Sequence, residues 1–140
     1  MSKISVLIVD DNEVDRYLLK RQLKETKLDV AVFEKENGKE ALDFFNVYDE
    51  NRENHPGLFP PLVVFLDINM PLVNGFEFLS KYGPLRSKHN IEAGFIMMFS
   101  SSESPLDRKK ALEFDYVKGY LTKGKFSSEE LKELISSLSV

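Results

Sequence analysis

Leu62-Val63-Val64-Phe65-Leu66-Asp67-Ile68-Asn69-Met70-Pro71 is a stretch in which five apolar residues run directly into an aspartate, and a proline follows shortly after. An apolar run of this length, rich in Val and Phe, is typical of a strand buried on both faces. Such a strand carries the residue after it to the carboxyl edge of a parallel sheet, where open α/β sheets bind ligands. Asp67 is therefore either a functional carboxylate or an ordinary loop residue, and this stretch alone does not separate the two.

The length and composition are those of an ordinary globular protein. The 140 residues suffice for one domain with a substantial core, and we expect a single domain over residues 1–140. The absence of cysteine excludes disulfides and thiolate metal sites, and the net charge of −4 argues against direct nucleic-acid binding. With no signal-peptide pattern and no run of membrane-spanning length, we expect a cytoplasmic protein without a membrane partner.

Further apolar runs predict four more strands, and the residues between them predict helices. The expected strands are Ile4 to Val9, Val30 to Phe33, Phe95 to Phe99 and, with an edge-like composition, Tyr116 to Leu121. Each helix has a capping signal, at Asn12, Asn37, Asn74, Ser104-Pro105 and Ser127. Strand and helix alternate five times. This order predicts right-handed βαβ units and a parallel sheet with helices on both sides.

Details of the helices carry their own expectations. The helix capped by Asn12 is expected to bury a stripe containing Leu18, Leu19 and Leu23, although the stripe is untidy. Gly83-Pro84 is expected to end or break the helix that Asn74 begins. The segment from Tyr48 to Pro61 has no clear periodicity, and its later part is expected to be an exposed loop that follows an extended second helix.

The strand ends bring polar side chains to one edge of the predicted sheet. These residues are Asp10 and Asp11 after the first strand, Asp67 after the third, Ser100 after the fourth and Lys123 after the fifth. Taken singly, the acidic pair could be solvated, the serine could belong to a polar turn and the lysine could lie on an ordinary surface. Their convergence at one edge favours a shared site over these separate readings.

The chemistry of this set points to phosphoryl transfer. Three close carboxylates repel one another, and a divalent cation such as Mg²⁺, which takes oxygen ligands, would relieve the conflict. Lys123 can pair with anionic oxygens, and Ser100 offers a hydroxyl donor. A carboxylate nucleophile, a metal, a lysine and a hydroxyl are the parts needed to accept a phosphoryl group, with Asp67 attacking in line.

Across essentially its whole length the sequence resembles the receiver domain of bacterial two-component response regulators, of the stand-alone, chemotaxis-regulator-like type. The matching segments are Val9-Asp10-Asp11, Leu66 to Pro71 with Asn74-Gly75, Met98 to Ser101, and Tyr120 to Lys123. The resemblance implies a flavodoxin-like three-layer α/β/α sandwich whose five-stranded parallel sheet has the order 2-1-3-4-5. The chain would be a stand-alone receiver or a receiver cut from a longer chain.

The resemblance also implies a role for each site residue. Asp67 would be the phosphoacceptor. Mg²⁺ would be held by Asp10, Asp11, Asp67 and the backbone carbonyl of Asn69, and Lys123 would pair with the phosphoryl group. Ser100 and Tyr120 would be the switch residues, with Ser100 moving to a phosphoryl oxygen and Tyr120 turning inward. The remodelled surface would be that of the fourth predicted helix, the fifth strand and the fifth helix.

The implied partners are proteins. A sensor histidine kinase or a histidine phosphotransfer protein would supply the phosphoryl group, and an unidentified downstream protein would read the switched face. The resemblance leaves open a phosphorylation-dependent dimer. The protein would not be an enzyme in the usual sense, catalysing at most its own phosphorylation and dephosphorylation.

Other functions compatible with the fold are a pseudo-receiver that is never phosphorylated, a phosphohydrolase and a flavodoxin. The intact acidic pair counts against the pseudo-receiver. Asn69 stands where a phosphohydrolase of this type needs a second aspartate, and the loop after the first strand is acidic instead of phosphate-binding. The sequence departs from the family pattern at Gly124, where a proline is usual, and at Phe114-Asp115-Tyr116, where a small Gly-Ala pair is usual.

Overall fold

The computed structural model describes residues 3–138, which form one parallel sheet covered by helices on both faces. The strand order β2-β1-β3-β4-β5 is the predicted one. The strands are β1 (Ile4–Val9), β2 (Val30–Lys35), β3 (Val63–Leu66), β4 (Phe95–Ser100) and β5 (Val117–Thr122). The helices of the described part are α1 (Glu13–Glu25), α2 (Gly38–Asn46), α3 (Tyr48–Asn54), α4 (Gly75–His89), α5 (Pro105–Leu112) and α6 (Ser128–Leu138).

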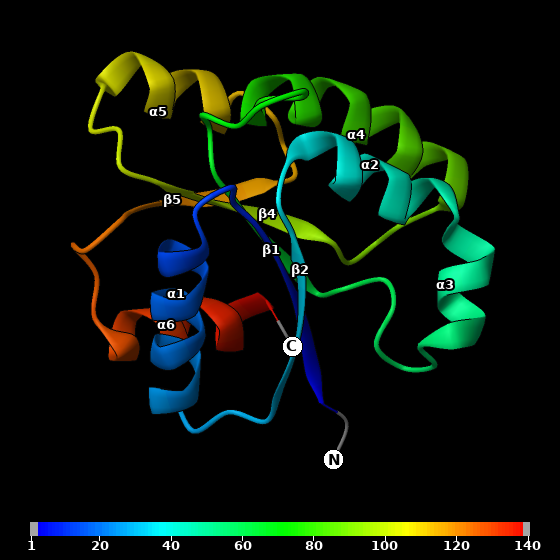
Figure 1. The fold of residues 1–140 in the computed structure, drawn as a ribbon, viewed down its shortest axis with the longest axis horizontal. Helices are drawn as coiled ribbons and strands as arrows, with labels where there is room; N and C mark the ends of the chain where they lie inside the picture. The colour runs from blue at the N-terminus through cyan, green and yellow to red at the C-terminus, as the bar shows by residue number, and fades with distance from the viewer. Residues whose placement is uncertain (1–2, 139–140) are drawn as a thin grey trace.

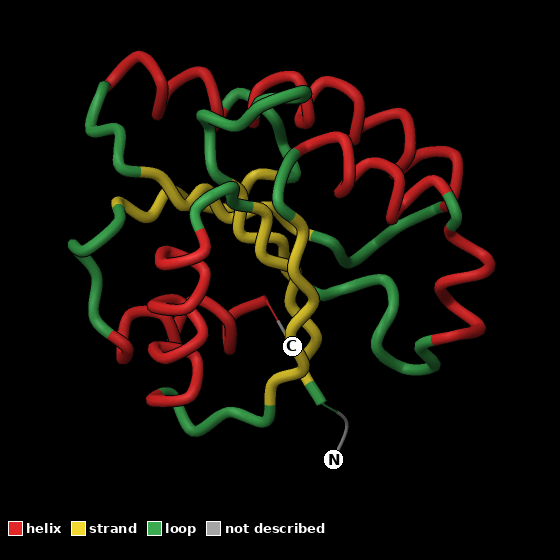
Figure 2. The backbone as a smooth tube through the Cα atoms, viewed as in Figure 1, coloured by secondary structure: helices red, strands yellow, loops and turns green. Residues whose placement is uncertain are grey.

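The helices form two layers, which Figures 1 and 2 show on opposite sides of the sheet. Helices α2, α4 and α5 cover one face, and α1 and α6 cover the other. Alternate strand residues enter the two cores because side chains of a strand point to opposite faces. In β3, for example, Val64 and Leu66 join the core under α2 and α4, while Val63 and Phe65 join the core under α1 and α6. This two-sided burial fixes the register of β3 and so the place where Asp67 emerges.

The predicted caps are present. Asn12, Asn37 and Asn74 each accept a hydrogen bond from the backbone N–H three residues later, and Asn74 forms a full capping box with Glu77. Ser127 forms the same reciprocal pair with Glu130, at the start of α6. These bonds satisfy free N–H groups at helix starts and set where each helix leaves its loop.

The prediction that Gly83-Pro84 ends a helix is wrong, because α4 continues through Pro84 to His89. Pro84 lacks the N–H that would bond to the Ser80 carbonyl, but both residues are exposed, so water can satisfy that carbonyl. Beyond the proline, Arg86 donates to the Ala93 and Gly94 carbonyls, which holds the last turns in place. The helix ends at Asn90, which has the left-handed conformation of a C-cap.

The prediction of an exposed loop before β3 is also partly wrong. Residues Tyr48–Asn54 form a separate helix, α3, instead of a continuation of α2. The Asn51 side chain donates to the Phe44 carbonyl at 2.6 Å, and Tyr48 stacks on His89 with ring centroids 4.5 Å apart. In the loop that follows, Phe59 is buried in the aromatic core. Tertiary contacts therefore order a segment that shows no periodicity.

The face that α1 buries differs from the predicted one by one residue. Leu19 and Leu23 are buried as expected, whereas Leu18 is 48% exposed and Arg16 is buried. Arg16 donates to the Asp10 carbonyl at 2.7 Å, which fixes the rotation of α1 about its axis. None of the helices within residues 3–138 has both the length and the apolar character needed to cross a membrane.

Candidate functional site

The first two carboxylates of the site are placed by the main chain of the central strands. Asp10 and Asp67 immediately follow β1 and β3, and both are buried, with 0% and 6% of their surface exposed. The Asp10 N–H donates to the Lys35 carbonyl at 3.1 Å, and the Asp67 N–H donates to the Val9 carbonyl at 3.0 Å. The sheet hydrogen bonds thus extend to the carboxylates themselves and leave their backbones little freedom.

A glycine lets the loop after β3 fold back against Asp67. The Gly75 N–H donates to the Ile68 carbonyl at 2.8 Å, and a Cβ at Gly75 would lie only 2.4 Å from the Asp67 carbonyl oxygen. No side chain fits in that space without moving the backbone. Asp67 Oδ1 also accepts a hydrogen bond from the Ile68 N–H at 2.8 Å. The Asn74-Gly75 pair therefore helps to fix the carboxylate as well as to start α4.

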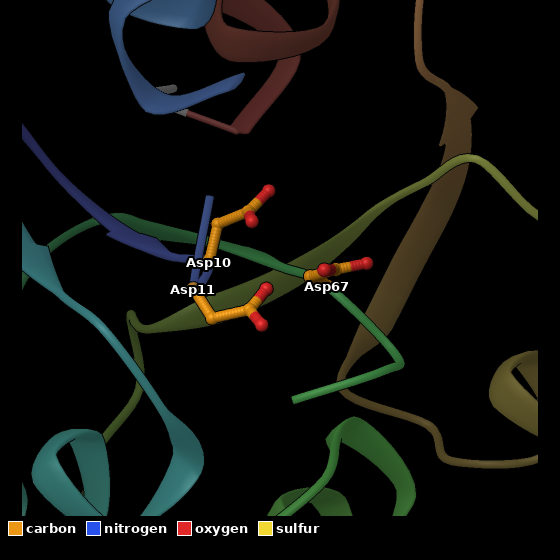
Figure 3. A group of neighbouring side chains, drawn as sticks. All are labelled: Asp10, Asp11 and Asp67. Atoms are coloured by element: carbon orange, nitrogen blue, oxygen red, sulfur yellow. The ribbon is translucent and has the colours of Figure 1, made fainter. Parts of the chain in front are cut away.

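Asp11 completes an acidic cluster with these two residues. One carboxylate oxygen from each of Asp10, Asp11 and Asp67 lies within 4.8 Å of the other two, and Figure 3 shows the three groups at the ends of β1 and β3. With Mg–O bonds of about 2.1 Å, oxygens on opposite sides of Mg²⁺ are about 4.2 Å apart. Neighbouring oxygens around the ion are about 3.0 Å apart. Side-chain movements that draw the three oxygens together would therefore fit them to a hard divalent cation.

Lys123 enters the cluster from the end of β5. Its Nζ lies 2.7 Å from Asp10 Oδ2, 2.8 Å from Asp15 Oδ2 and 3.5 Å from Asp67 Oδ2. The backbone N–H of Lys123 donates to the Ser100 carbonyl at 2.8 Å, which ties the ends of β4 and β5 together. One ammonium thus faces three carboxylates, and the site keeps an excess of negative charge.

Burial and charge shift the pKa values of the site residues. Burial, followed by the charge of Asp10, raises the pKa of Asp67 to about 6 against the opposing effect of Lys123. Burial also raises the pKa of Asp10, although Lys123 works against that shift. Burial alone would lower the pKa of Lys123, but hydrogen bonds to Asp10 and Asp15 raise it. The negative charge of the carboxylates is therefore not fully balanced by Lys123, and a bound cation would stabilise it.

Ser100 and Tyr120 meet at a single loop residue, Ser102. The Ser102 N–H donates to Ser100 Oγ at 3.1 Å, and the Tyr120 hydroxyl donates to the Ser102 carbonyl at 2.8 Å. The Ser100 hydroxyl proton has no acceptor among the described residues. Tyr120 is only 9% exposed, and Arg108 Cζ lies 5.7 Å from the centre of its ring, so the ring is buried here; its movement on phosphorylation stays a prediction.

The structure therefore gathers four of the predicted residues, Asp10, Asp11, Asp67 and Lys123, into one cluster. Ser100 ends the neighbouring strand, while Tyr120 contacts the loop after β4 and not the acidic cluster. Asn69 is exposed on the loop after Asp67, and the role of its carbonyl remains a prediction.

The structure shows how the chain accommodates its two departures from the family pattern, at Gly124 and at Phe114-Asp115-Tyr116. Gly124 has φ of +77°, a conformation that proline cannot adopt, and a Cβ at this position would meet open space. The Tyr116 hydroxyl bonds to the Leu79 carbonyl, and Arg86 lies 5.4 Å from its ring, so the larger residues there pack against α4.

Two residues of the site were not identified from the sequence. Asp15 and Arg16 lie in the first turn of α1, where Asp15 reads only as a favourable acid near a helix N-terminus. In the structure Asp15 binds Lys123, and Arg16 binds the Asp10 carbonyl and Glu34. The one sequence signal is proximity: Asp15 lies in the first turn of the helix that directly follows the Asp10-Asp11 pair.

Comparison with known proteins gives a consistent result. The family model described as "Response regulator receiver domain" matches residues 6–136. Chemotaxis protein CheY of Halobacterium salinarum is 33% identical over 134 residues, covering 95% of this chain and 94% of that protein. The two-component response regulator ARR17 of Arabidopsis thaliana is 30% identical over 111 residues, covering 79% of this chain and 69% of its own length.

The fold is matched equally well by solved structures. The crystal structure of a two-component response regulator from Cytophaga hutchinsonii superimposes with a TM-score of 0.78 at 25% identity, and the match covers 99% of this chain and 98% of that one. The strand order 2-1-3-4-5 and the placement of the acidic cluster at the carboxyl edge agree with the flavodoxin-like receiver fold.

Proposed function

The chain belongs to the response regulator receiver domain family, and from this premise we propose that it is a phosphorylation-dependent switch whose phosphoacceptor is Asp67. Receiver domains are signalling switches and not enzymes in the usual sense. The observation that carries the proposal is the position of Asp67, buried at the end of β3, with Lys123 Nζ 3.5 Å away and two further carboxylates beside it.

The proposed donor is a phosphohistidine on a histidine kinase or phosphotransfer protein. An Asp67 carboxylate oxygen attacks the phosphorus, the bond from phosphorus to the donor nitrogen breaks, and the imidazole leaves with a proton from solvent. Burial limits the orientations open to the Asp67 side chain, which supports in-line attack by the oxygen that faces the cluster. Lys123 offers its ammonium to the oxygens of the transferring group, where negative charge accumulates.

The acidic residues have a second proposed role as ligands for Mg²⁺. Asp10, Asp11, Asp67 and the Asn69 carbonyl would hold the ion, and the raised pKa values of Asp10 and Asp67 support a site that lacks positive charge. When bound, Mg²⁺ supplies charge neutralisation for the phosphoryl oxygens.

The output is proposed to pass through Ser100 and Tyr120. A phosphorylated side chain carries roughly −1.5 to −2 charges and has three acceptor oxygens. Ser100 has a proton to donate, and moving it toward Asp67 would disturb the bonds at Ser102 that also hold Tyr120. Two or three charge-assisted bonds at roughly 1.5–3 kcal/mol each would supply the roughly 5 kcal/mol that inverts a two-state equilibrium. The responding surface is that of α5, β5 and α6, for a downstream protein.

The test is incubation with acetyl phosphate and Mg²⁺ followed by intact-mass measurement. Wild type is expected to gain one phosphoryl group, and Asp67→Asn is expected to gain none. Asp49→Asn, which removes an exposed carboxylate on α3, serves as the matched control and should behave as wild type. A wild type that stays unmodified with both acetyl phosphate and a phosphorylated histidine donor would identify the chain as a pseudo-receiver and overturn the proposal.

A further inference from the structure

Lys123 divides its charge among three carboxylates, and one of these does not lie at a strand end. Its Nζ is 2.7 Å from Asp10, 2.8 Å from Asp15 and 3.5 Å from Asp67. The contact with Asp15 has the geometry of a hydrogen bond, whereas 3.5 Å is longer than an ordinary N–H···O bond. The ammonium that would assist Asp67 is thus held more closely by two other residues.

Asp15 is itself held firmly by the start of α1. The Asn12 side chain accepts a hydrogen bond from the Asp15 N–H at 3.1 Å, which fixes the first turn of the helix. The next residue, Arg16, donates to the Asp10 carbonyl at 2.7 Å and so ties that turn to the end of β1. The Asp15 carboxylate therefore has a defined position relative to the acidic cluster and is not a freely moving surface group.

We propose that Asp15 is a positioning residue, which holds the Lys123 ammonium on the α1 side of the site until Asp67 is phosphorylated. Lys123 then exchanges Asp15 for a phosphoryl oxygen. This inference rests on the proposed function of Asp67.

Three features make Asp15 the partner that Lys123 gives up. Its side chain is 29% exposed, against 0% for Asp10 and 8% for Asp67, so water can replace the lost bond most easily at Asp15. Phosphorylation raises the negative charge at Asp67 from one to roughly 1.5–2, while Asp15 keeps a single charge. The flexible four-carbon stem of lysine allows the small movement required. Asp15 therefore competes with the phosphoryl group for Lys123.

The resting position of Lys123 can be measured without any phosphorylation. The ¹H–¹⁵N signal of its ammonium, assigned with a Lys123→Arg sample, is compared in wild type and Asp15→Asn, each alone and with Mg²⁺ and beryllofluoride as a phosphoryl mimic. In the resting protein Asp15→Asn should shift the signal toward the position that wild type reaches with beryllofluoride. An Asp15→Asn signal that coincides with the resting wild-type signal overturns the proposal.

The kinetic consequence has a matched control on the same helical turn. At saturating Mg²⁺, Asp15→Asn should be phosphorylated by acetyl phosphate about three- to tenfold faster than wild type, the scale of one redistributed charge-assisted contact. Glu13→Gln removes the same charge from an exposed side chain that has no ion pair or hydrogen bond in the described residues, and should stay within about twofold. The gain should persist at high salt, because Lys123 is only 15% exposed.

Equal rates for Asp15→Asn and Glu13→Gln, or a gain that high salt abolishes, would mean that the charge acts only at long range and would overturn the positioning role. Circular dichroism melts verify folding, and Asp15→Ser replaces Asp15→Asn if the latter is unfolded. If wild type accepts no phosphoryl group, the proposed function fails. The resting ammonium signal then still decides whether Asp15 holds Lys123.

Discussion

The two halves of the site are held by different kinds of contact. At the ends of β1 and β3, main-chain bonds fix the residues: the N–H groups of Asp10 and Asp67 continue the sheet, and Gly75 packs against the Asp67 carbonyl. At the ends of β4 and β5 one main-chain bond, from the Lys123 N–H to the Ser100 carbonyl, also continues the sheet, but the functional groups of Ser100, Tyr120 and Lys123 are held by side-chain contacts. Ser100 and Tyr120 each bond to the loop after β4.

This difference indicates a division of work within the site. A main-chain bond between strands cannot be exchanged without moving the sheet, which two packed cores oppose. A hydroxyl or an ammonium can exchange one partner for another by rotation about single bonds on a short timescale. The β1–β3 half is therefore suited to holding the reacting atoms, and the β4–β5 half is suited to responding to their charge. Changes to the first half should be costly, and changes to the second should be mild.

The largest effect is expected from Gly75→Ala. The new Cβ would lie 2.4 Å from the Asp67 carbonyl, so the loop or the end of β3 must move. We expect a loss of about 3 kcal/mol in the free energy of unfolding, measured by urea denaturation. A displacement of about 1 Å at Asp67 should also slow phosphorylation by about 100-fold. Gly57→Ala is the control: it adds a Cβ in open space at φ of +76°, so only backbone strain of about 1 kcal/mol is expected.

The next substitution, Asp67→Asn, is expected to increase stability. It tests whether repulsion between buried carboxylates destabilises the β1–β3 half of the site. Burial and the charge of Asp10 raise the pKa of Asp67 to about 6, above the ordinary value of 3.8 that holds in the unfolded chain. Between these values the folded state binds more protons than the unfolded state, so stability should fall as pH rises from about 4 to about 6. At pH 7, without Mg²⁺, Asp67→Asn should be more stable than wild type by about 2 kcal/mol.

Urea denaturation of both proteins in EDTA at pH 7 and pH 4 measures this difference. The advantage of Asp67→Asn should disappear at pH 4, where wild-type Asp67 is protonated in the folded state, and Asp49→Asn should change stability by less than about 0.5 kcal/mol at either pH. An advantage for Asp67→Asn that is equally large at pH 4 would show that packing, and not charge, limits stability at this position.

Tyr120→Phe tests the β4–β5 half of the site. The substitution keeps the buried ring and removes only the hydrogen bond to the Ser102 carbonyl, so we expect a loss of about 1 kcal/mol by urea denaturation. The initial rate of phosphorylation by acetyl phosphate should stay within about twofold of wild type, because the bond does not involve the reacting atoms. A loss of phosphorylation comparable to that of Gly75→Ala would contradict the division between the two halves.

The same division explains what the sequence could predict. Asp10, Asp67, Ser100 and Lys123 were identified because apolar strands of definite length end at these residues, and the ends of parallel strands share one edge. Helix starts were predicted for a similar reason, since a cap such as Asn74 acts on N–H groups only three residues away. Local chemistry and strand order together fixed most of the fold.

What the sequence missed depends on contacts between distant segments. Asp15 reaches Lys123 only because Arg16 sets the rotation of α1, and the untidy apolar stripe of that helix does not define this rotation. Helix α3 is too short to show periodicity and is held by Tyr48 and Asn51. Helix α4 continues through Pro84, where Ser80 is exposed and Arg86 bonds to the distant Ala93 and Gly94 carbonyls, and no local sequence pattern records these contacts.

The smallest effect on stability is expected at the surface, where the loops after β4 and β5 contact each other. Lys125, just beyond Gly124, forms an ion pair with Glu103 in the loop after β4, and the two side chains are 65% and 58% exposed. Exposed pairs of this kind are strongly screened, so Lys125→Ala should change the free energy of unfolding by less than about 0.5 kcal/mol. A double-mutant cycle with Glu103→Ala measures the pair directly, at low and at high salt. A coupling energy near 2 kcal/mol that survives high salt would mean that the loops after β4 and β5 move as one rigid unit. In that case the β4–β5 half of the site would be as rigid as the β1–β3 half, and the response to phosphorylation would have to come from elsewhere in the fold.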